Sequence, residues 1–229
     1  MKILIISATE AEIAPLLGRE ELRTISTDGN HRVFILNNQE IHFVTTGIGM
    51  TATAAFTSAF LAKHSFDCAI NAGICGSFNS EIPLGEVVIV ERECISELGV
   101  EDGEQFISAD KIGLHGISQW PYTDGWILDS NSYFREFQSL RKCSGITVNT
   151  VHGNDDSIAD IKSRITVDVE SMEGAGFLYS CRLIPTPAIQ LRAVSNYVER
   201  RDKSKWNIPK AIDNLNEILF IGLDKLTKR

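Results

Sequence analysis

The sequence lacks the patterns that mark metal-binding, secreted and membrane-spanning proteins. None of its five cysteines forms a C-x-x-C pair, and none of its five histidines has a zinc-type partner at close spacing, so we expect no metal. No stretch approaches the roughly 18 apolar residues of a membrane helix, so we expect no membrane partner. The odd cysteine count and the lack of a signal-peptide pattern at the N-terminus predict a cytoplasmic protein with reduced thiols.

The chain also lacks an excess of positive charge. It carries 22 lysines and arginines against 30 aspartates and glutamates, which gives a net charge of −8. A protein of this sign repels the phosphate backbone, so we expect no nucleic-acid partner. The short basic cluster of Arg200, Arg201, Lys203 and Lys205 surrounds an aspartate and is typical of an exposed loop.

No linker, low-complexity run or internal repeat divides the sequence. Its 229 residues are 43% hydrophobic and 23% charged, an ordinary balance for a globular protein that can bury one large core. Residues 97–129 are rich in glycine, serine and aspartate, and we expect a long loop there rather than a domain boundary. We therefore predict a single domain over residues 1–229.

Apolar runs that fit buried strands alternate with helical patterns along the chain. Runs of this kind indicate strands buried on both faces, and the alternation predicts a three-layer α/β/α fold with a central mixed sheet. The predicted strands are residues 3–6, 32–36, 40–46, 67–72, 85–92, 146–151 and 187–194. The predicted helices follow Thr9, cover residues 51–64, 130–140, 155–161 and 177–183, and begin again near Asn207.

Residues 167–176 concentrate polar side chains where a predicted strand meets a predicted helix. A β-branched run ends there in Glu170, Ser171, Met172 and Glu173, and two glycines follow before the helical run. Open α/β sheets bind ligands at such carboxyl ends of strands. A purely structural interpretation stays open, with Ser171 as an N-cap and Glu173 as a first-turn acid.

Polar residues follow other predicted strands as well. Glu12 comes after the first strand, a predicted glycine turn at residues 73–77 follows a later one, and Asn196 follows the last. Glu12 also completes a capping box with Thr9, and turn residues need no ligand. The glycines of residues 47–49, between a strand and a helix, either admit a ligand to the backbone or form a plain tight turn.

Five short segments together resemble the nucleoside phosphorylase and nucleosidase family over nearly the whole chain. They are SATEAE at residues 7–12, TGIG at 46–49, NAGICG at 71–76, ESMEGA at 170–175 and RAVSN at 192–196. The block SNYVERRDKSKWNIP at residues 195–209 is most similar to the branch that hydrolyses futalosine, a hypoxanthine nucleoside of menaquinone biosynthesis. The resemblance implies a nucleoside phosphorylase-like fold, a small-molecule nucleoside substrate, no cofactor and a homo-oligomer.

The resemblance also implies roles for individual residues. Glu12 matches the acid that activates water, and Glu173 matches the residue that binds the ribose hydroxyls. Asn196 matches the partner of the leaving base, and Met172 matches a methionine packed on the sugar or simply fills the core. Further substrate-binding residues implied by the matching segments are Ile48, Gly73 and Ser195.

The residue expected at the leaving base favours one class of purine. Relatives that cleave methylthioadenosine or S-adenosylhomocysteine carry an aspartate where this chain has Asn196. An asparagine amide can donate to the 6-oxo group of hypoxanthine and accept from a protonated N7. A mismatched set of donors and acceptors would leave buried polar groups unpaired, so we expect a 6-oxopurine leaving group.

The other end of futalosine carries a carboxyl group. An arginine or lysine should bind it. The candidates are Arg200, Arg201, Lys203 and Lys205, and the sequence does not choose among them. Residues 153–157 lack the aromatic side chain that the adenine-cleaving relatives stack on the purine, so the residue that contacts the base from this loop stays open.

Three alternative functions stay open. A methylthioadenosine/S-adenosylhomocysteine nucleosidase would favour an acid at position 196. An inosine phosphorylase would accept Asn196, but the charge of Glu12 would repel phosphate. A nucleoside-binding protein without turnover is compatible with the same fold, although it would not need both Glu12 and Glu173.

Overall fold

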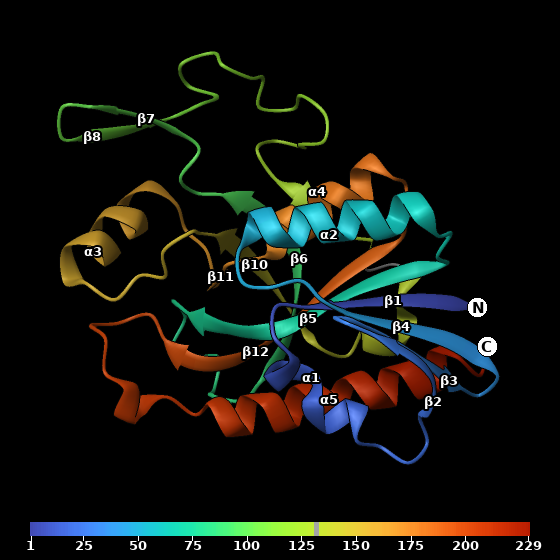
Figure 1. Cartoon of the computed structure of the whole chain (residues 1–229). Coiled ribbons are helices and arrows are strands. Elements are labelled where there is room, and N and C mark those ends of the chain that lie inside the picture. Colours follow the sequence, from blue (N-terminus) through green and yellow to red (C-terminus); the bar gives the residue numbers. More distant parts are fainter. Residues whose placement is uncertain (131–132) are drawn as a thin grey trace.

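The structure, a computed structural model, describes residues 1–130 and 133–229 of the chain. A mixed sheet lies between two layers of helices (Figure 1). Helices α2 (Met50–Lys63) and α4 (Gly174–Leu183) pack on each other over one face of the sheet. Helices α1 (Glu10–Leu17) and α5 (Ile208–Leu226) cover the other face. The three-layer α/β/α class predicted from the sequence is therefore confirmed.

The central sheet combines parallel and antiparallel pairs in the order β11-β10-β6-β12-β5-β1-β4-β3-β2. Strand β11 also pairs antiparallel with the end of β5, so β5, β12, β6, β10 and β11 close into a ring. This closure brings the ends of β5, β11 and β12 together on one side of the molecule. The strands are β1 (Lys2–Ser7), β2 (Arg23–Asp28), β3 (His31–Leu36), β4 (Gln39–Thr45), β5 (Cys68–Ser77), β6 (Val87–Ile95), β10 (Arg141–Thr147), β11 (Val169–Ser171) and β12 (Ala188–Tyr197).

The segment predicted as a long loop, residues 97–129, contains short strands. β7 (Gly99–Asp102) and β8 (Gln105–Ser108) form a separate hairpin, and β9 (Ile127–Leu128) pairs with β6. In Figure 1 the hairpin and the chain that follows it stand away from the central sheet. The remaining elements are α3 (Asp155–Arg164) and two short 3₁₀ helices, η2 (Arg135–Phe137) and η3 (Lys203–Lys205).

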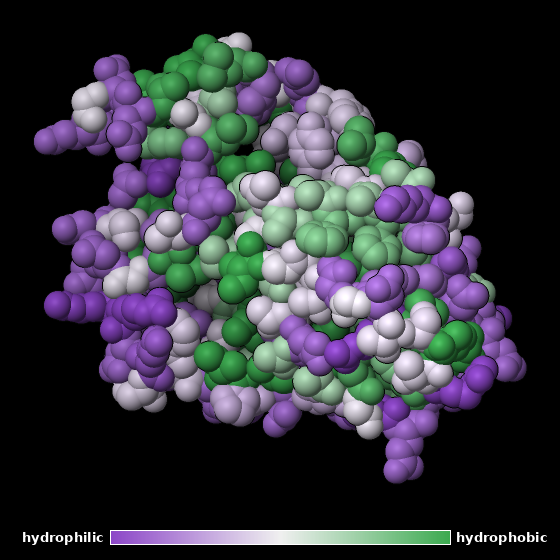
Figure 2. Space-filling view, viewed as in Figure 1, coloured by the Kyte–Doolittle hydropathy of each residue, from purple (hydrophilic) through white to green (hydrophobic). Residues whose placement is uncertain are grey.

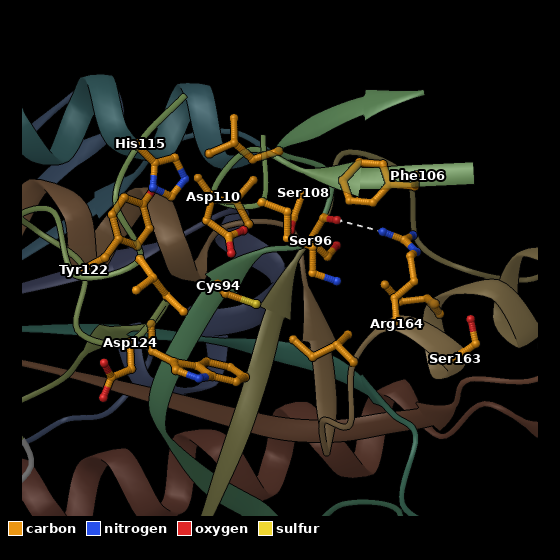
Figure 3. Close-up of a pocket in the computed structure, with 18 residues that line it drawn as sticks. Cys94, Ser96, Phe106, Ser108, Asp110, His115, Tyr122, Asp124, Ser163 and Arg164 are labelled. Carbon is orange, nitrogen blue, oxygen red and sulfur yellow. Dashed lines mark hydrogen bonds between the residues drawn. The ribbon is translucent and has the colours of Figure 1, made fainter. Parts of the chain in front are cut away.

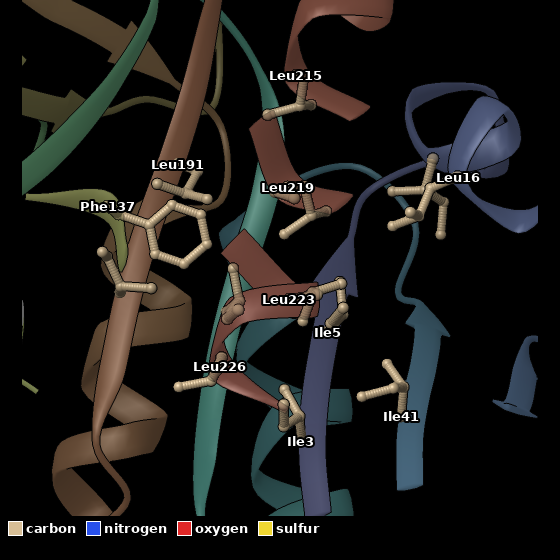
Figure 4. Packing of buried hydrophobic residues seen from close by; sticks show 14 of the residues in the cluster. Ile3, Ile5, Leu16, Ile41, Phe137, Leu191, Leu215, Leu219, Leu223 and Leu226 are labelled. Carbon is tan, nitrogen blue, oxygen red and sulfur yellow. The ribbon is translucent and has the colours of Figure 1, made fainter. Parts of the chain in front are cut away.

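The apolar side of α5 packs on the sheet. Leu215, Leu219, Leu223 and Leu226 lie against residues of β1 and its neighbours (Figure 4). All four leucines are at most 1% exposed, and each fully buried leucine contributes about 1.5–3 kcal/mol of transfer free energy. Among the described residues, neither α5 nor any other helix combines the length and apolarity that a membrane crossing needs.

Two sequence predictions need correction, and one strand was missed. The prediction of a helix at residues 130–140 is wrong in the described part of that range, where 3₁₀ structure, including η2, and turns form instead of an α-helix. Residues 131 and 132 lie outside the described part. The strand expected at residues 146–151 lies at Arg141–Thr147, because the exposed Arg141 and Lys142 begin it before the apolar run. Strand β2 was not predicted, because all six of its residues are exposed and show no apolar alternation.

The glycine turn predicted at residues 73–77 is also wrong, because β5 continues through it to Ser77. The glycines make room for side chains of neighbouring strands. A Cβ on Gly73 would lie 2.3 Å from Nη1 of Arg192, and a Cβ on Gly76 would lie 3.0 Å from Cγ2 of Val198. Glycine inside a strand often marks such a close approach. The prediction failed because the neighbours that need this space are more than 100 residues away in the sequence.

Candidate active site

A pocket of about 400 Å³ lies where β5, β11 and β12 end, beside the N-termini of α1 and α5. The space-filling view in Figure 2 shows apolar residues in green and polar residues in purple on the side of the molecule where these strands end. The structure brings six of the seven predicted site residues to the wall of this pocket. They are Glu12, Ile48, Met172, Glu173, Ser195 and Asn196, and the seventh, Gly73, lies just behind Glu12.

Glu12 is fixed at the start of α1 with its carboxylate at the pocket. Its Oε2 accepts hydrogen bonds from the Thr9 backbone N–H at 2.9 Å and the Thr9 hydroxyl at 2.9 Å. Its Oε1 accepts from the backbone N–H of Ile74 at 3.1 Å. The predicted capping box is therefore confirmed, and the same side chain, 7% exposed, lines the pocket. The helix cap holds the carboxylate in one orientation toward the cavity.

Glu173 stands at the N-cap of α4, 5% exposed, and its two carboxylate oxygens have different partners. Oε1 accepts from the backbone N–H of Gly49 at 3.2 Å, and Oε2 accepts from Nη1 of Arg192 at 3.2 Å. Gly49 has a φ of 99°, which favours glycine, so the turn at residues 47–49 presents its N–H to a site carboxylate. Each oxygen keeps a lone pair for a further donor.

Arg192 is a component of the site that sequence reasoning did not assign a role. It is 1% exposed in the middle of β12, where it donates to Glu173, to Oε1 of Gln190 at 2.9 Å and to Oδ1 of Asn71. Arg192 also lies close to Gly73 and Glu12. A Cβ on Gly73 would lie 2.3 Å from Nη1 of Arg192 and 2.9 Å from Oε1 of Glu12. An arginine inside an apolar strand is the signal that could have identified it, since buried charges are normally paired.

A second buried carboxylate, Glu93, extends this network away from the pocket. The Gln190 amide donates to Oε2 of Glu93 at 2.8 Å, so hydrogen bonds connect Glu93 through Gln190 and Arg192 to Glu173. Oε1 of Glu93 has no hydrogen-bond partner in the part of the chain that the structure describes. Burial raises the pKa of Glu93 to about 7, against the weaker lowering by the Gln190 hydrogen bond.

Asn196 and Ser195 lie at a bulge near the end of β12. The pairing of β12 with β5 shifts register between Val194 and Asn196. The Asn196 Oδ1 accepts from the Ser195 hydroxyl at 2.8 Å, and its Nδ2 donates to the backbone carbonyl of Tyr197 at 3.0 Å. An amide has two N–H groups and two lone pairs on its oxygen, so Asn196 keeps one donor and one acceptor for a ligand.

Next to Asn196, a histidine and a glutamate form a pair that sequence reasoning missed. Nδ1 of His152 lies 2.6 Å from Oε2 of Glu170, and the His152 backbone N–H donates to Oε1 of the same carboxylate at 3.0 Å. Glu170 is 2% exposed, and both residues line the pocket. Glu170 belongs to the segment 167–176 that the sequence singled out, but its partner comes from a distant loop.

The four basic residues proposed for a substrate carboxylate have different positions. Arg201 lines the pocket, and its guanidinium carbon lies 4.8 Å from the ring centroid of Trp206. Arg200 approaches Asp155 at 3.9 Å on the exposed surface, and Lys205 pairs with Glu199. Of the four, Arg201 is the one that the pocket includes.

A second cavity of about 400 Å³ lies between the segment after β6 and helix α3 (Figure 3). Arg164 donates to the Ser96 carbonyl at 3.1 Å and lies over the Phe106 ring, while the rings of His115 and Tyr122 stack. This cavity contains none of the predicted site residues. Among the described residues, no group of three histidine, cysteine or acidic side chains is arranged to hold a metal ion.

Comparisons with known proteins agree with the resemblance seen in the sequence. A family model described as "Phosphorylase superfamily" matches residues 2–221. The chain is 27% identical over 214 residues to a futalosine hydrolase of Thermus thermophilus, and the match covers 93% of this chain and 91% of that protein. It is 33% identical over 249 residues to a 5′-methylthioadenosine/S-adenosylhomocysteine nucleosidase of Aeromonas salmonicida, covering 99% of this chain and 100% of that one.

A solved structure shows the same fold. The native structure of futalosine hydrolase from Helicobacter pylori superposes with a TM-score of 0.82, at 17% identity and over 98% of each chain. The nucleoside phosphorylase-like arrangement expected from the sequence is thereby confirmed. At this identity, the likeness concerns the fold and carries no residue roles.

Proposed function

Because the chain belongs to the phosphorylase superfamily, we propose that it is a nucleosidase that hydrolyses futalosine to hypoxanthine and dehypoxanthinyl futalosine, a reaction of menaquinone biosynthesis. The observation that carries the proposal is the meeting of Glu12, Glu173 and Asn196 at one pocket. These residues come from the start of α1, the start of α4 and the end of β12. The three groups match the three needs of N-glycosidic hydrolysis.

The first two needs concern water and ribose. Cleavage develops oxocarbenium character on the ribose, and a carboxylate can activate the water that attacks C1′. Glu12 is fixed for this role by its bonds to Thr9 and Ile74. Glu173 keeps lone pairs for the ribose hydroxyls, and hydrogen bonds to a charged acceptor are roughly twice as strong as neutral ones.

The third need is a partner for the departing base. Asn196 keeps one N–H for the 6-oxo group of hypoxanthine and one lone pair for a protonated N7. Adenine would place its amino donor against the amide N–H. We therefore propose that Asn196 selects a 6-oxopurine. A methylthioadenosine/S-adenosylhomocysteine nucleosidase is the second candidate, because the relative from Aeromonas salmonicida with 33% identity bears that name.

Two features support hydrolysis without phosphate. The Glu12 carboxylate would repel a phosphate at the position of the attacking water. Arg192, the cation behind Gly73, is 1% exposed, and four of its five N–H groups already donate inside the protein, to Glu173, Gln190, Asn71 and the carbonyl of Ile74. We further propose that Arg201, at the pocket wall beside Trp206, binds the substrate carboxylate.

The test measures hypoxanthine release from futalosine with and without phosphate, beside adenine release from methylthioadenosine. Phosphate-independent hypoxanthine release, with little adenine release, is the expected result. The matched variant Asn196→Asp should lower the ratio of futalosine to methylthioadenosine turnover. Adenine release by the unmodified chain would refute the role of Asn196, and tight binding without turnover would indicate a nucleoside-binding protein. The single domain, the homo-oligomer and the cytoplasmic location stay predictions.

A further inference from the structure

The pair of His152 and Glu170 is not explained by the three roles assigned so far. Glu170 is 2% exposed, and both of its oxygens bind one residue, through the His152 backbone N–H and through Nδ1 at 2.6 Å. Because Nδ1 is committed to Glu170, the ring nitrogen left for a ligand is Nε2. Among the described residues, none forms a hydrogen bond with that nitrogen, and the His152 side chain is 11% exposed at the pocket.

The pair lies at the same end of the pocket as Asn196. A Cβ built on Gly76 would lie 3.3 Å from Nδ2 of Asn196 and 3.5 Å from Cγ of Glu170. The two side chains therefore approach the same point from β12 and from β11. Glycine at position 76 leaves this space open, and the antiparallel pairing of Glu170 with Gly76 fixes the separation.

The chemistry at this end of the pocket requires a proton. A purine leaves with the electron pair of the glycosidic bond and becomes a good leaving group only when it is protonated. The Asn196 amide can donate a hydrogen bond, but an amide does not give up a proton near neutral pH. The position that holds an acid in the adenine-cleaving relatives therefore supplies no proton here.

We propose that His152, held by Glu170, donates a proton from Nε2 to the departing purine. This assignment rests on the proposed function. A carboxylate on Nδ1 fixes the tautomer and the ring plane of a histidine. Histidine is also the side chain most often used to transfer protons in enzymes.

The proposed step balances as follows. The C1′–N9 bond breaks, its electron pair goes to the purine, and N7 of the purine takes the proton from His152 Nε2. The N7–H that forms is then shared between Nε2 of His152 and Oδ1 of Asn196. The water oxygen bonds to C1′, and the proton of that water goes to Glu12. His152 is left neutral with its Nδ1–H donated to Glu170. Both His152 and Glu12 then exchange protons with solvent when the products leave.

An alternative interpretation is that Glu170 only tethers the loop that carries His152. The test separates the two interpretations by comparing a leaving group that needs a proton with one that does not. It compares His152→Gln with the unmodified chain on a purine nucleoside and on 4-nitrophenyl β-D-ribofuranoside, whose phenolate leaves without protonation. The exposed-loop variant His115→Gln is the matched control, because His115 lines the second cavity.

We expect His152→Gln to lower kcat on the purine nucleoside by about 10²–10⁴-fold, the usual contribution of a general acid, and to change kcat on the 4-nitrophenyl riboside by less than about 3-fold. Glu170→Gln should give the same pattern with a smaller loss. An equal loss on both substrates, or no loss on the purine nucleoside, would overturn the proposal. If the glutamine variant does not fold, His152→Ala with added imidazole replaces it. If imidazole does not restore kcat in that variant, the result counts against the proposal.

The outcome is separate from that of the proposed function. Should the unmodified chain release adenine from methylthioadenosine and nothing from futalosine, the substrate assignment fails. The same comparison with methylthioadenosine in place of futalosine still tests whether His152 supplies the proton.

Discussion

Replacing Glu93 by glutamine should change how the stability of the protein depends on pH. Glu93 is 1% exposed, and its Oε1 has no hydrogen-bond partner in the described part of the chain. Burial raises its pKa from 4.5 to about 7. A buried carboxyl group that is raised in this way binds its proton more tightly in the folded chain than in the unfolded one.

The sign and size of the effect follow from these two pKa values. The contribution of Glu93 to stability is complete below pH 4.5 and is lost as the pH rises to about 7. At about 1.4 kcal/mol for each pH unit, the loss amounts to about 3 kcal/mol. Glutamine is neutral at every pH and can still accept the hydrogen bond from Gln190. The variant should therefore match the unmodified chain near pH 4.5 and exceed its stability by about 3 kcal/mol at pH 8.

Urea unfolding, followed by the fluorescence of the three tryptophans, measures this difference at a series of pH values. Protein concentration must be the same for both proteins, because association would shift the apparent stability. Burial also lowers the pKa values of His31 and His42 below 6.5, but both proteins share these histidines. Two stability curves that run parallel from pH 4.5 to 8 would refute the reasoning.

Three further substitutions test the hydrogen bonds at the pocket. Glu12→Gln should lower kcat by about 10²–10⁴-fold, and it should lower stability by about 1–3 kcal/mol because the amide leaves the N–H of Thr9 or Ile74 unpaired; initial rates and urea unfolding check both effects. Arg192→Met leaves the Glu173 carboxylate buried without its cation, which should lower the free energy of unfolding by about 3–5 kcal/mol. Adding Glu173→Gln to this variant should restore much of the stability, measured by urea unfolding, but not the activity. Gly73→Ala places a Cβ 2.3 Å from Nη1 of Arg192 and should lower kcat/KM at least about tenfold. The control is Gly116→Ala, whose Cβ meets no atom closer than 3.7 Å. Unchanged kinetics in Gly73→Ala would contradict the close approach of Arg192 to Gly73.

The elements that the sequence predicts well are those with local signals. The run at residues 3–6 becomes β1, and Thr9 and Glu12 cap α1 as expected. Asn37 and Asn38 take φ values of 50° and 62° in the tight turn between β3 and β4, and asparagine tolerates this left-handed conformation. In each case the residues that decide the conformation are neighbours in the chain, so the pattern is visible before the fold is known.

The polar network of the site was not predictable in the same way. Arg192, Asn71 and Gln190 come from adjacent strands, and their hydrogen bonds depend on the parallel pairing of β12 with β5. His152 and Glu170 are 18 residues apart in the sequence and meet because the chain after β10 returns past the end of β11. A resemblance supplied Glu12, Glu173, Asn196 and Ser195, whose hydroxyl donates to Asn196, but it gave no role to Arg192, which donates to Glu173.

The bulge in β12 shows why sequence and pairing must act together at the leaving-base end. In a regular strand Val194 and Asn196 would point to the same face, because side chains alternate with a period of two. Their partners in β5 are the consecutive residues Cys75 and Gly76, which point to opposite faces, so Ser195 is the extra residue of a bulge. The bulge re-aims Asn196 toward Gly76, where its Nδ2 lies 3.3 Å from the position of a Cβ. Any larger residue at position 76 would therefore close the space that the bulge opens, and the asparagine would not reach a base there.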